Sequence, residues 1–411
     1  MRPFDRQRVL LGVTGGIASY KSAWLARLLT AAGAEVDVVM TRSATEFIGP
    51  VTFEALTGRP VHTELIAAGH ALDHIRLARA AACIVVAPAT AEFLARTAGA
   101  HAGDLLSACL LAAECPVLLV PAMNDRMWRH AGVRRNADEA RALGYTVLDP
   151  DDGPLAVGEG SGPGRMPEPD TIMAHIARLL TPRGPLHSRH VLVTAGPTRE
   201  AVDPVRFLSN RSSGKMGVEL AAAAWRRSAR VTLVAGPLEV AEPTGAHIIR
   251  VESTAQMRDA VAAEVTCADV LIMAAAPADF SPLAPATRKL KKADAADSLR
   301  LARTDDILAV TQHLRPRSLI TVGFALETGD PRAEGRRKLV AKSLDMIVAN
   351  DATEPGAGFG VDTNRVTLLH ADGTDEALPL QSKYEVADAI LDRIERRLVQ
   401  AHDGLENTDE R

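Results

Sequence analysis

Aromatic residues are scarce in this chain of 411 residues, where Phe, Trp and Tyr together make up 3% of the sequence. Proteins that bind single-stranded nucleic acids stack the bases on aromatic side chains, so this scarcity argues against such a role. Cysteine is also rare, with four residues and no CxxC pair. This usage is typical of reduced thiols, and we expect a cytoplasmic protein.

The chain also lacks a strong excess of charge and any long apolar run. Its formal net charge is -4 and no basic block stands out, which argues against a nucleic-acid partner. The apolar run within residues 1–13 is too short for a signal peptide, and no segment approaches the length of a membrane span. The hydrophobic share of 47% is sufficient for a core in each half of the chain.

Short apolar runs alternate with helical segments rich in Ala and Leu along the whole chain. Apolar strands separated by helices indicate a parallel sheet that is covered on both faces. The polar residues 181–190 interrupt the pattern, which then restarts. We therefore predict two doubly wound, Rossmann-like α/β domains, residues 1–183 and 188–411, the first of them flavodoxin-like. The runs predicted as strands are 9–13, 36–40, 84–88, 117–121, 191–195, 231–235, 270–274, 320–324, 346–349 and 366–369.

Two further segments break the alternation of strands and helices. Residues 149–169 are rich in Gly and Pro and are predicted to form a long loop, which in compact domains is often a lid. Residues 282–296 form a basic stretch that includes Lys289. Considered alone, this stretch is best explained as a solvated charge run.

A glycine pair follows the first predicted strand, in the sequence VTGGIASYK. Gly15 and Gly16 allow close approach of a ligand, and the following helix offers free N–H groups to an anion, although a tight turn would also explain the pair. The GxGxxG pattern is absent, and the second strand ends at Thr41, where dinucleotide enzymes have an acidic residue. A mononucleotide phosphate therefore fits better than NAD.

Two polar residues lie next to later strands of the first half. Asn124, in PAMNDRMW, follows the fourth strand, where its amide could donate to a carboxylate or its oxygen could cap the next helix. His74, in DHIRLAR, precedes the third strand, and a single histidine at such a place is more often structural.

The motifs GGIASYK, DHIRLAR, APATAEFLAR, PAMNDRMW and GPGRM occur in this order within residues 6–180. Together they resemble the FMN-containing cysteine decarboxylases, and specifically the phosphopantothenoylcysteine decarboxylases. The resemblance implies that His74 is the base acting on the substrate and that Asn124 holds the substrate carboxylate. It implies that FMN is held by Gly15, Gly16, Ile17, Thr41, Ala89, Thr90 and Met123.

The chemistry explains the cofactor, because a cysteine carboxylate has no electron sink for the carbanion that decarboxylation leaves. Oxidation of the thiol carbon by FMN gives a thioaldehyde, loss of carbon dioxide gives an enethiol, and the final reduction needs a proton. In the bacterial enzymes that this half resembles, the long loop carries a Cys as the proton donor, whereas this chain has Val157. Glu159 is the nearest titratable candidate. The alternative is an active ligase fused to a flavin-binding scaffold with impaired decarboxylation.

The second half opens with TAGPTREAVDPVRFLSNRSSGKMG, residues 194–217. Ser209 and Met216 occupy the two decisive positions of a Walker A motif, so the segment is not a P-loop. The dinucleotide pattern GxGxxG is also absent, so a dinucleotide reductase is the weaker alternative. Hydrogen-bond donors gathered before a helix favour phosphate or carboxylate binding, although Ser212 and Ser213 could equally be helix caps. In KLVAK, Lys338 and the lysine four residues later are expected on one helix face.

The motifs DPVRFLSNRSSGKMG, MAAAPADF, RKLKK, GFALET and KLVAK resemble those of phosphopantothenate–cysteine ligase over residues 188–395. The resemblance implies that Asn210 stabilises an acyl-cytidylate and that Lys289 takes part in catalysis. The family's Asn-Pro-Asp-Ile stretch appears as RTDDIL, with Asp305 in place of the proline. The residues implied to bind CTP are Met273, Ala274, Ala275, Asp279, Lys289, Asp305, Asp306, Ile307, Leu308, Phe324, Lys338 and Lys342.

Both activities would belong to coenzyme A synthesis, because the ligase product is the decarboxylase substrate. CTP converts the carboxylate of 4′-phosphopantothenate into a mixed anhydride, which the cysteine amine then attacks. Lysines and Mg²⁺ would neutralise the triphosphate, although the sequence reveals no protein metal site. The resemblance further implies a homo-oligomer of trimeric decarboxylase cores and ligase dimers, and we expect a dodecamer with neither nucleic acid nor membrane as a partner.

Overall fold

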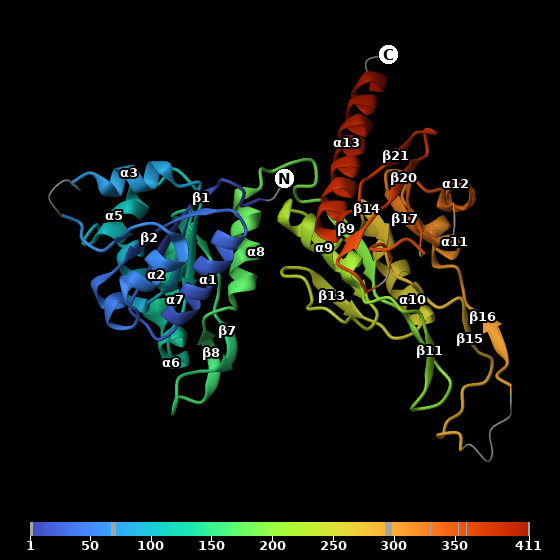
Figure 1. Ribbon diagram of the computed structural model, residues 1–411, viewed down its shortest axis with the longest axis horizontal. Helices are drawn as coiled ribbons and strands as arrows, with labels where there is room; N and C mark the ends of the chain where they lie inside the picture. Colours follow the sequence, from blue (N-terminus) through green and yellow to red (C-terminus); the bar gives the residue numbers. More distant parts are fainter. Residues whose placement is uncertain are drawn as a thin grey trace. The chain divides into compact units, whose positions relative to one another are not determined.

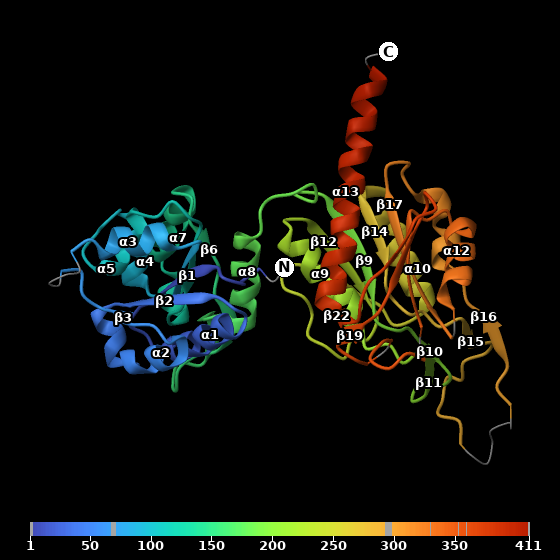
Figure 2. The ribbon, with the colours of Figure 1, turned by 45° about the horizontal axis from the view of Figure 1, so that its top comes forward.

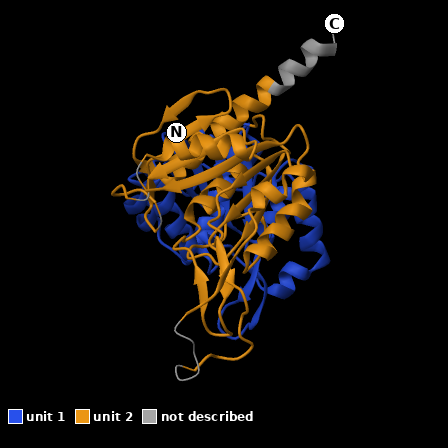
Figure 3. Cartoon of the chain, turned by 90° about the vertical axis from the view of Figure 1, so that its right-hand side faces the viewer, with its two compact units in different colours: residues 1–182 blue, residues 183–411 orange. Residues whose placement is uncertain are grey.

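The chain folds into two compact units, residues 1–182 and 183–411. Figure 1 labels most of their helices and strands, and Figure 3 colours the two units separately. The structure is a computed structural model, and each unit is described here by itself. It describes residues 3–66, 71–291, 298–328, 330–351, 353–358 and 360–409, with side chains up to residue 400.

A six-stranded parallel sheet forms the centre of the first unit, in the order β3-β2-β1-β4-β5-β6. Its core strands are apolar on both faces and almost entirely buried, as a sheet between two helical layers requires. The strands are β1 (Arg8–Val13), β2 (Glu35–Met40), β3 (Val61–His62), β4 (Cys83–Ala89), β5 (Val117–Pro121) and β6 (Thr146–Val147).

Helices cover both faces of this sheet (Figure 2). One face carries α1 (Ser19–Ala31), α2 (Pro50–Thr57) and α8 (Pro169–Leu180), and the other carries α3 (Asp73–Ala80), α4 (Ala91–Ala98), α5 (Leu105–Leu111) and α7 (Ala131–Ala142). The short η1 (Arg42–Glu46) and α6 (Asp125–Arg129) follow the carboxyl ends of β2 and β5.

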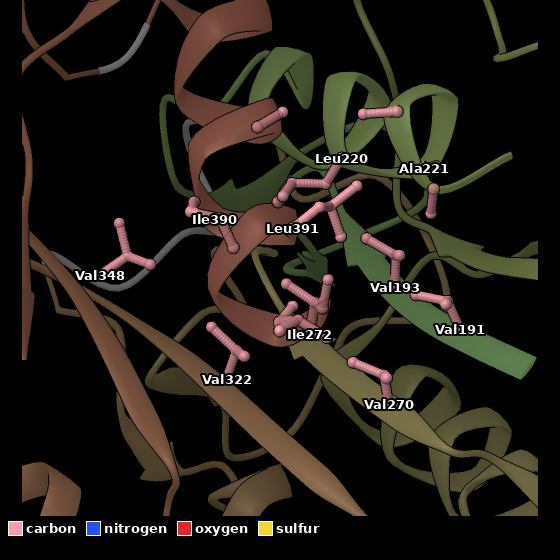
Figure 4. Close-up of a cluster of buried hydrophobic side chains, with 14 of the residues drawn as sticks. Val191, Val193, Leu220, Ala221, Val270, Ile272, Val322, Val348, Ile390 and Leu391 are labelled. Atoms are coloured by element: carbon pink, nitrogen blue, oxygen red, sulfur yellow. The ribbon is translucent and has the colours of Figure 1, made fainter. Parts of the chain in front are cut away.

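The second unit has an eight-stranded sheet in the order β13-β12-β9-β14-β17-β18-β20-β21, whose last two strands run antiparallel. The strands are β9 (His190–Ala195), β12 (Arg230–Ala235), β13 (His247–Arg250), β14 (Val270–Met273), β17 (Ile320–Glu327), β18 (Met346–Asp351), β20 (Thr367–His370) and β21 (Asp375–Ala377). Helices α9 (Lys215–Arg226) and α13 (Lys383–Asp409) cover one face, with Leu220 and Leu391 packed against strand residues such as Val193 (Figure 4). The other face carries α10 (Thr254–Glu264), α11 (Ile307–Val310) and α12 (Pro331–Ala341), and the short η2 (Val265–Cys267) and η3 (Gln312–Leu314) follow α10 and α11.

The prediction of two doubly wound α/β domains is confirmed, and every predicted strand overlaps a strand of the structure. The sheet of the first domain extends the flavodoxin strand order by one edge strand. Its order is the Rossmann order, because the two-residue strand β3 extends the sheet beyond β2. Without β3 the remaining strands would have the flavodoxin order. Such a short edge strand has no apolar run by which the sequence could reveal it.

Small antiparallel pairs account for most of the other strands that the sequence did not predict. Residues 149–169 are not simply a loop, because β7 (Asp151–Pro154) pairs with β8 (Ser161–Arg165) as a hairpin. In the second unit β10 (Arg199–Ala201) pairs with β11 (Phe207–Ser209), β15 (Phe280–Pro282) with β16 (Leu301–Arg303), and β19 (Thr363–Asn364) with β22 (Gln381–Ser382). Among the described residues, no helix is both long and apolar enough to span a membrane.

Candidate active sites

The first unit has a cavity of about 530 Å³ at the carboxyl ends of β1, β4 and β5. Thr14, directly after β1, donates its hydroxyl to the Pro88 carbonyl (2.7 Å) and accepts from the Thr90 N–H (3.1 Å). This pair of bonds joins β1 to β4 at the point where the strand order reverses, which is where open α/β sheets bind ligands.

The glycine pair forms one wall of this cavity. A Cβ on Gly15 would lie 2.5 Å from the side chain of Ser43, so the turn after β1 packs directly on the turn after β2. A Cβ on Gly16 would have no neighbour closer than 3.8 Å, and Gly16 and Ile17 line the cavity. Neither residue donates its N–H to another described residue, so both amides are available to an anion before the start of α1.

Asn124 lies in the cavity and is also a helix cap. Its Oδ1 accepts from the Arg126 N–H at 2.9 Å, which caps α6. Its Nδ2 has no partner among the described residues, and the side chain lines the cavity. The two readings of this residue are therefore compatible, because capping uses the oxygen and leaves the amide N–H groups to donate to a ligand.

The β7–β8 hairpin forms another wall of the cavity and is fastened to the Asn124 loop. The Met123 N–H donates to the Gly164 carbonyl (3.0 Å), and a Cβ on Gly164 would lie 2.2 Å from the Met123 oxygen. Glu159, in the turn of the hairpin, lines the cavity. Val157 is fully exposed at the tip and does not line it.

A buried lysine connects α1 to the end of the hairpin. The Lys21 ammonium is 6% exposed and donates to the Met166 carbonyl (2.7 Å) and to Glu168 Oε1 (3.0 Å). The hydrogen bond from Lys21 lowers the pKa of Glu168, and Arg165 adds to this effect. In the sequence Lys21 is marked only as a member of the GGIASYK motif. The two bonds made by its ammonium show that it joins α1 to the end of the hairpin.

The structure brings together most, but not all, of the residues predicted for this site. Thr90 and Met123 line the cavity, whereas Ala89 is buried in β4 and Thr41 lies behind Gly15 and Ser43. His74, which the resemblance implies to be the base, lies on α3 and does not line the cavity. Its Nδ1 is buried without a hydrogen-bond partner among the described residues.

The second unit has a cavity of about 320 Å³ at the carboxyl ends of β9, β14 and β17. Here Thr194 of β9 donates to Met273 Sδ (3.7 Å) and accepts from the Ala275 N–H (3.1 Å). This contact repeats that of Thr14 in the first unit and again joins the two strands between which the order reverses.

The start of α9 faces this cavity. Ser212, Ser213 and Lys215 line it, and Ser212 accepts from the Gly214 N–H at 3.3 Å. The helix begins with Gly214 at a φ of 81°, a left-handed conformation that favours glycine, and no side chain caps it. Its first N–H groups are therefore suited to bind an anion.

Asn210 is not a helix cap. Its Nδ2 donates to the carbonyl oxygens of Ala276 (3.1 Å) and Pro277 (3.0 Å). The side chain thereby joins the β11–α9 connection to the segment after β14, and it lines the cavity.

Only part of the predicted nucleotide set lines the cavity, namely Ala274, Ala275, Asp279 and Phe324. Met273, Ile307 and Leu308 are buried and do not line it. Lys289 is exposed on its loop. A second group, described next, contains the remaining acidic residues and lysines.

This second group consists of ion pairs around the start of α11 and the end of α12. Lys342, the residue that ends α12, pairs with Asp306 at 2.8 Å, and Lys338 pairs with Glu327 at 2.5 Å. Asp305 pairs with Arg258. Burial is the largest single influence and would raise the pKa of Asp306, but the hydrogen bond and charge of Lys342 together with backbone hydrogen bonds leave the pKa below its usual value.

The two groups are neighbours in the fold. Glu327 ends β17, whose Phe324 lines the cavity, and the Thr304 N–H donates to the Asp279 carbonyl at 3.0 Å. The lysines are neutralised by carboxylates of the same chain, and a triphosphate would have to displace those partners.

Residues from the end of the chain complete the cavity, and sequence reasoning missed them. Asn350 and Asn364 are buried and joined by a hydrogen bond of 3.3 Å. Lys383, the first residue of α13, donates to the carbonyls of Gly358 (3.1 Å) and Val361 (2.6 Å), and burial lowers its pKa. Asn350 directly follows the predicted strand 346–349 and could have been found by the rule that placed Asn124, but nothing local marks Lys383.

The residues present fit a mononucleotide in the first unit and a nucleotide triphosphate in the second. The first cavity combines free amides at Gly16 and Ile17 with largely apolar walls, as a flavin ring and its phosphate require. In the part of the chain that the structure describes, no three His, Cys, Asp or Glu side chains form a metal cluster.

Comparisons with known proteins cover both units. The family model "Flavoprotein" matches residues 2–181, and the model "DNA/pantothenate metabolism flavoprotein C-terminal domain" matches residues 186–398. The coenzyme A biosynthesis bifunctional protein CoaBC of Vibrio vulnificus (strain CMCP6) is 43% identical over 399 residues, covering 96% of this chain and 99% of that protein. The proteins of the same name from Bacillus subtilis and Mycolicibacterium smegmatis are each 45% identical, over 95% of this chain and 97% of their own.

Proposed function

The chain belongs to the CoaBC family of bifunctional coenzyme A biosynthesis proteins, and it combines an FMN-dependent decarboxylase with a ligase. On that premise we propose that residues 1–183 carry the decarboxylase and residues 188–411 the ligase. We further propose 4′-phosphopantothenate, cysteine and CTP as substrates, with the amide product passing to the decarboxylase.

In the decarboxylase, Asn124 would hold the substrate. Its Nδ2 is free to donate to the cysteine carboxylate, while its Oδ1 stays fixed by the Arg126 N–H. Bound FMN would supply the oxidation of the thiol carbon and return the same electrons after carbon dioxide has left. The Gly16–Ile17 amides support phosphate binding at the start of α1.

Glu159 would give the proton for the last step. It lines the cavity from the hairpin turn, whereas the side chain of Val157 points into solvent and has no proton to give. A carboxylic acid is a competent donor when a closed site excludes water. The hairpin position of Glu159 supports this role over the impaired-scaffold alternative.

His74 would act as the base in an oligomer. It does not reach the cavity of its own chain, so a second copy has to supply it. Tyr20 and Trp24 on α1 are 63% and 50% exposed beside the cavity mouth, and an apolar surface of this kind supports a subunit contact there. This agrees with trimeric decarboxylase cores.

In the ligase, the start of α9 would bind phosphate or carboxylate, and Asn210 would stabilise the acyl-cytidylate from its place beside Ala276. Lys289, Lys338 and Lys342 would neutralise the triphosphate together with Mg²⁺. The last two lysines would exchange Glu327 and Asp306 for phosphate oxygens. The exposed Lys289 would reach in from its loop.

Two further points follow for the assembly and its location. The β10–β11 and β15–β16 hairpins expose Val205, Phe207, Phe280, Leu283, Leu299 and Leu301, and this apolar surface supports a ligase dimer. Trimers linked by dimers would give a dodecamer. The four cysteines are all free thiols, which supports a cytoplasmic location.

The observation that carries this proposal is that each unit has a cavity at the switch point of its sheet, lined by the residues of its own motif. The test is to purify the full chain, identify the released cofactor by absorbance and mass, and follow phosphopantothenate, cysteine and CTP to phosphopantetheine. Recovery of NAD or FAD, or amide formation with no need for CTP, would overturn it.

A further inference from the structure

The loop that carries Lys289 is held by a buried carboxylate from a distant part of the chain. Asp203, in the turn between β10 and β11, has a fully buried side chain. Its two oxygens have different partners. Oδ1 accepts from the N–H groups of Val205 (2.8 Å) and Arg206 (2.9 Å) and closes its own turn.

The second oxygen, Oδ2, holds the Lys289 loop. It accepts from the Leu290 N–H (3.2 Å) and from Arg206 Nε (2.9 Å). Arg206 Nη2 in turn donates to the Leu290 carbonyl at 2.8 Å. Both backbone groups of Leu290 are therefore fixed by the Asp203–Arg206 pair.

The loop is also held on the other side of Lys289. The Ala286 N–H donates to the Val202 carbonyl at 2.9 Å, and β10 contacts β15, from which the loop departs (Figure 2). The Lys289 side chain itself is exposed and has no partner among the described residues. The backbone of Lys289 is thus fixed on both sides while its ammonium stays free.

Closing the β10–β11 turn explains only the hydrogen bonds to one oxygen of Asp203. It requires Oδ1 alone, as in an ordinary Asx turn. The bonds to Leu290 reach a segment 87 positions away and add nothing to that turn. The two hydrogen bonds from the Arg206 guanidinium keep the pKa of Asp203 well below its usual range, so the carboxylate stays an acceptor at neutral pH.

We infer that Asp203, through Arg206 and the backbone of Leu290, is a positioning residue for Lys289 in the ligase reaction. This inference rests on the proposed function, in which Lys289 acts on bound CTP. A mispositioned lysine loses its effect on charge that develops during cytidylate formation, while the ground-state binding of CTP changes less.

The test uses Asp203→Asn in the full-length, FMN-loaded protein. The amide can keep the Oδ1 bonds, but it turns an N–H toward the Leu290 N–H and the Arg206 guanidinium. We expect kcat for ligation to fall about ten- to hundredfold with a much smaller change in the KM for CTP, and the decarboxylase to be unchanged. Limited trypsin digestion should cut faster after Lys289 and Lys291.

A double-mutant cycle with Lys289→Gln shows whether Asp203 acts through the lysine. In the Lys289→Gln background, Asp203→Asn should lower kcat by less than about threefold, because the group that it positions is already gone. The matched control is Asp372→Asn, which alters another Asx turn of the same unit, where Asp372 accepts from the Thr374 N–H at 2.9 Å. This control should leave ligation and loop cleavage unchanged.

The outcomes distinguish the role of Lys289 in ligation from the positioning role of Asp203. Full ligation in Lys289→Gln overturns the proposed role of Lys289. A large loss in Lys289→Gln, combined with an additive effect or no effect of Asp203→Asn, overturns the positioning role alone. If Asp203→Asn does not fold, the cycle is run with Arg206→Lys, which keeps a cation beside Asp203 and removes the planar donor to the Leu290 carbonyl.

Discussion

Gly164 lies against Met123 so closely that a Cβ on the glycine would be 2.2 Å from the Met123 carbonyl oxygen. The two residues also share a hydrogen bond of 3.0 Å from the Met123 N–H to the Gly164 carbonyl. This contact fastens the β7–β8 hairpin, which carries Glu159, to the loop that carries Asn124. Two walls of the first cavity therefore depend on one glycine.

Gly164→Ala should separate these two walls. The new methyl group meets backbone, which cannot move aside as a flexible side chain could, and such overpacking costs about 1–3 kcal/mol. We expect loss of FMN and of decarboxylation, with ligation retained. Flavin absorbance and the two separate assays measure this. Gly49→Ala is the control, since a Cβ there meets nothing within 4 Å; normal flavin content in Gly164→Ala would contradict the prediction.

Glu159→Gln should stop the reaction at the oxidised enethiol. The glutamine lacks the acidic proton, and removing a general acid slows the step about a hundredfold or more. Mass analysis of the products measures the enethiol. Asp152→Asn, on the same hairpin but outside the cavity lining, is the control.

Val157→Cys extends this test, because it places a thiol, which can donate a proton, two positions from Glu159 in the turn of the same hairpin. We expect it to restore turnover in the Glu159→Gln variant. Unchanged phosphopantetheine formation in Glu159→Gln would show that another group is the donor. A wild type that itself stops at the enethiol would support the impaired-scaffold alternative.

Lys289→Gln should lower ligation by about a hundredfold and leave decarboxylation intact, because the lysine would offset charge that develops during cytidylate formation. Pyrophosphate release in single-turnover experiments measures the affected step. Arg288→Gln is the matched control for charge on the same loop. Ligation in Lys289→Gln at the wild-type rate would return the loop to a solvated charge run, and equal loss in both variants would show that the effect is not specific to Lys289.

Asn210→Asp should slow amide formation about ten- to hundredfold. The carboxylate would face the carbonyl oxygens of Ala276 and Pro277 without a hydrogen to donate, and it would repel an anionic phosphodiester. Quenched-flow detection of the acyl-cytidylate measures the effect. Asn136→Asp, in the first unit, controls for the added charge; an unchanged amide yield in Asn210→Asp would refute the role.

His175 should make the first unit less stable in acid. Burial, reinforced by Arg178, lowers the pKa of His175 to about 4, whereas the unfolded side chain has a pKa near 6.5. Between pH 6.5 and pH 4 the unfolded state therefore binds a proton at His175, whereas the folded state does not. The contribution of neutral His175 to the free energy of unfolding is fully present above about pH 6.5. The free energy of unfolding falls by up to about 2 kcal/mol as the pH is lowered towards 4.

Denaturant unfolding between pH 4 and 7 measures this dependence. His175→Gln should flatten the profile, and His101→Gln, at an exposed site, should not. A wild-type profile that is flat over this range would contradict the prediction.

The sequence by itself determined the central strands of both sheets and the motifs at their carboxyl ends. Runs such as Val117–Pro121 are apolar on both faces, which only a buried parallel strand explains, and Asn124 follows directly at the carboxyl edge. The glycine pair and Asn210 were found for the same reason, because switch-point loops carry their ligand groups close to a strand end.

Tertiary structure alone decided which of these residues meet. Lys383 and Asn364 reach the second cavity from the end of the chain, and Asp203 finds Leu290 across 87 positions. Such contacts follow from how the sheet orders its strands, and no local pattern encodes them. The same is true of His74, whose sequence motif predicts a catalytic base but whose helix keeps it away from the cavity of its own chain.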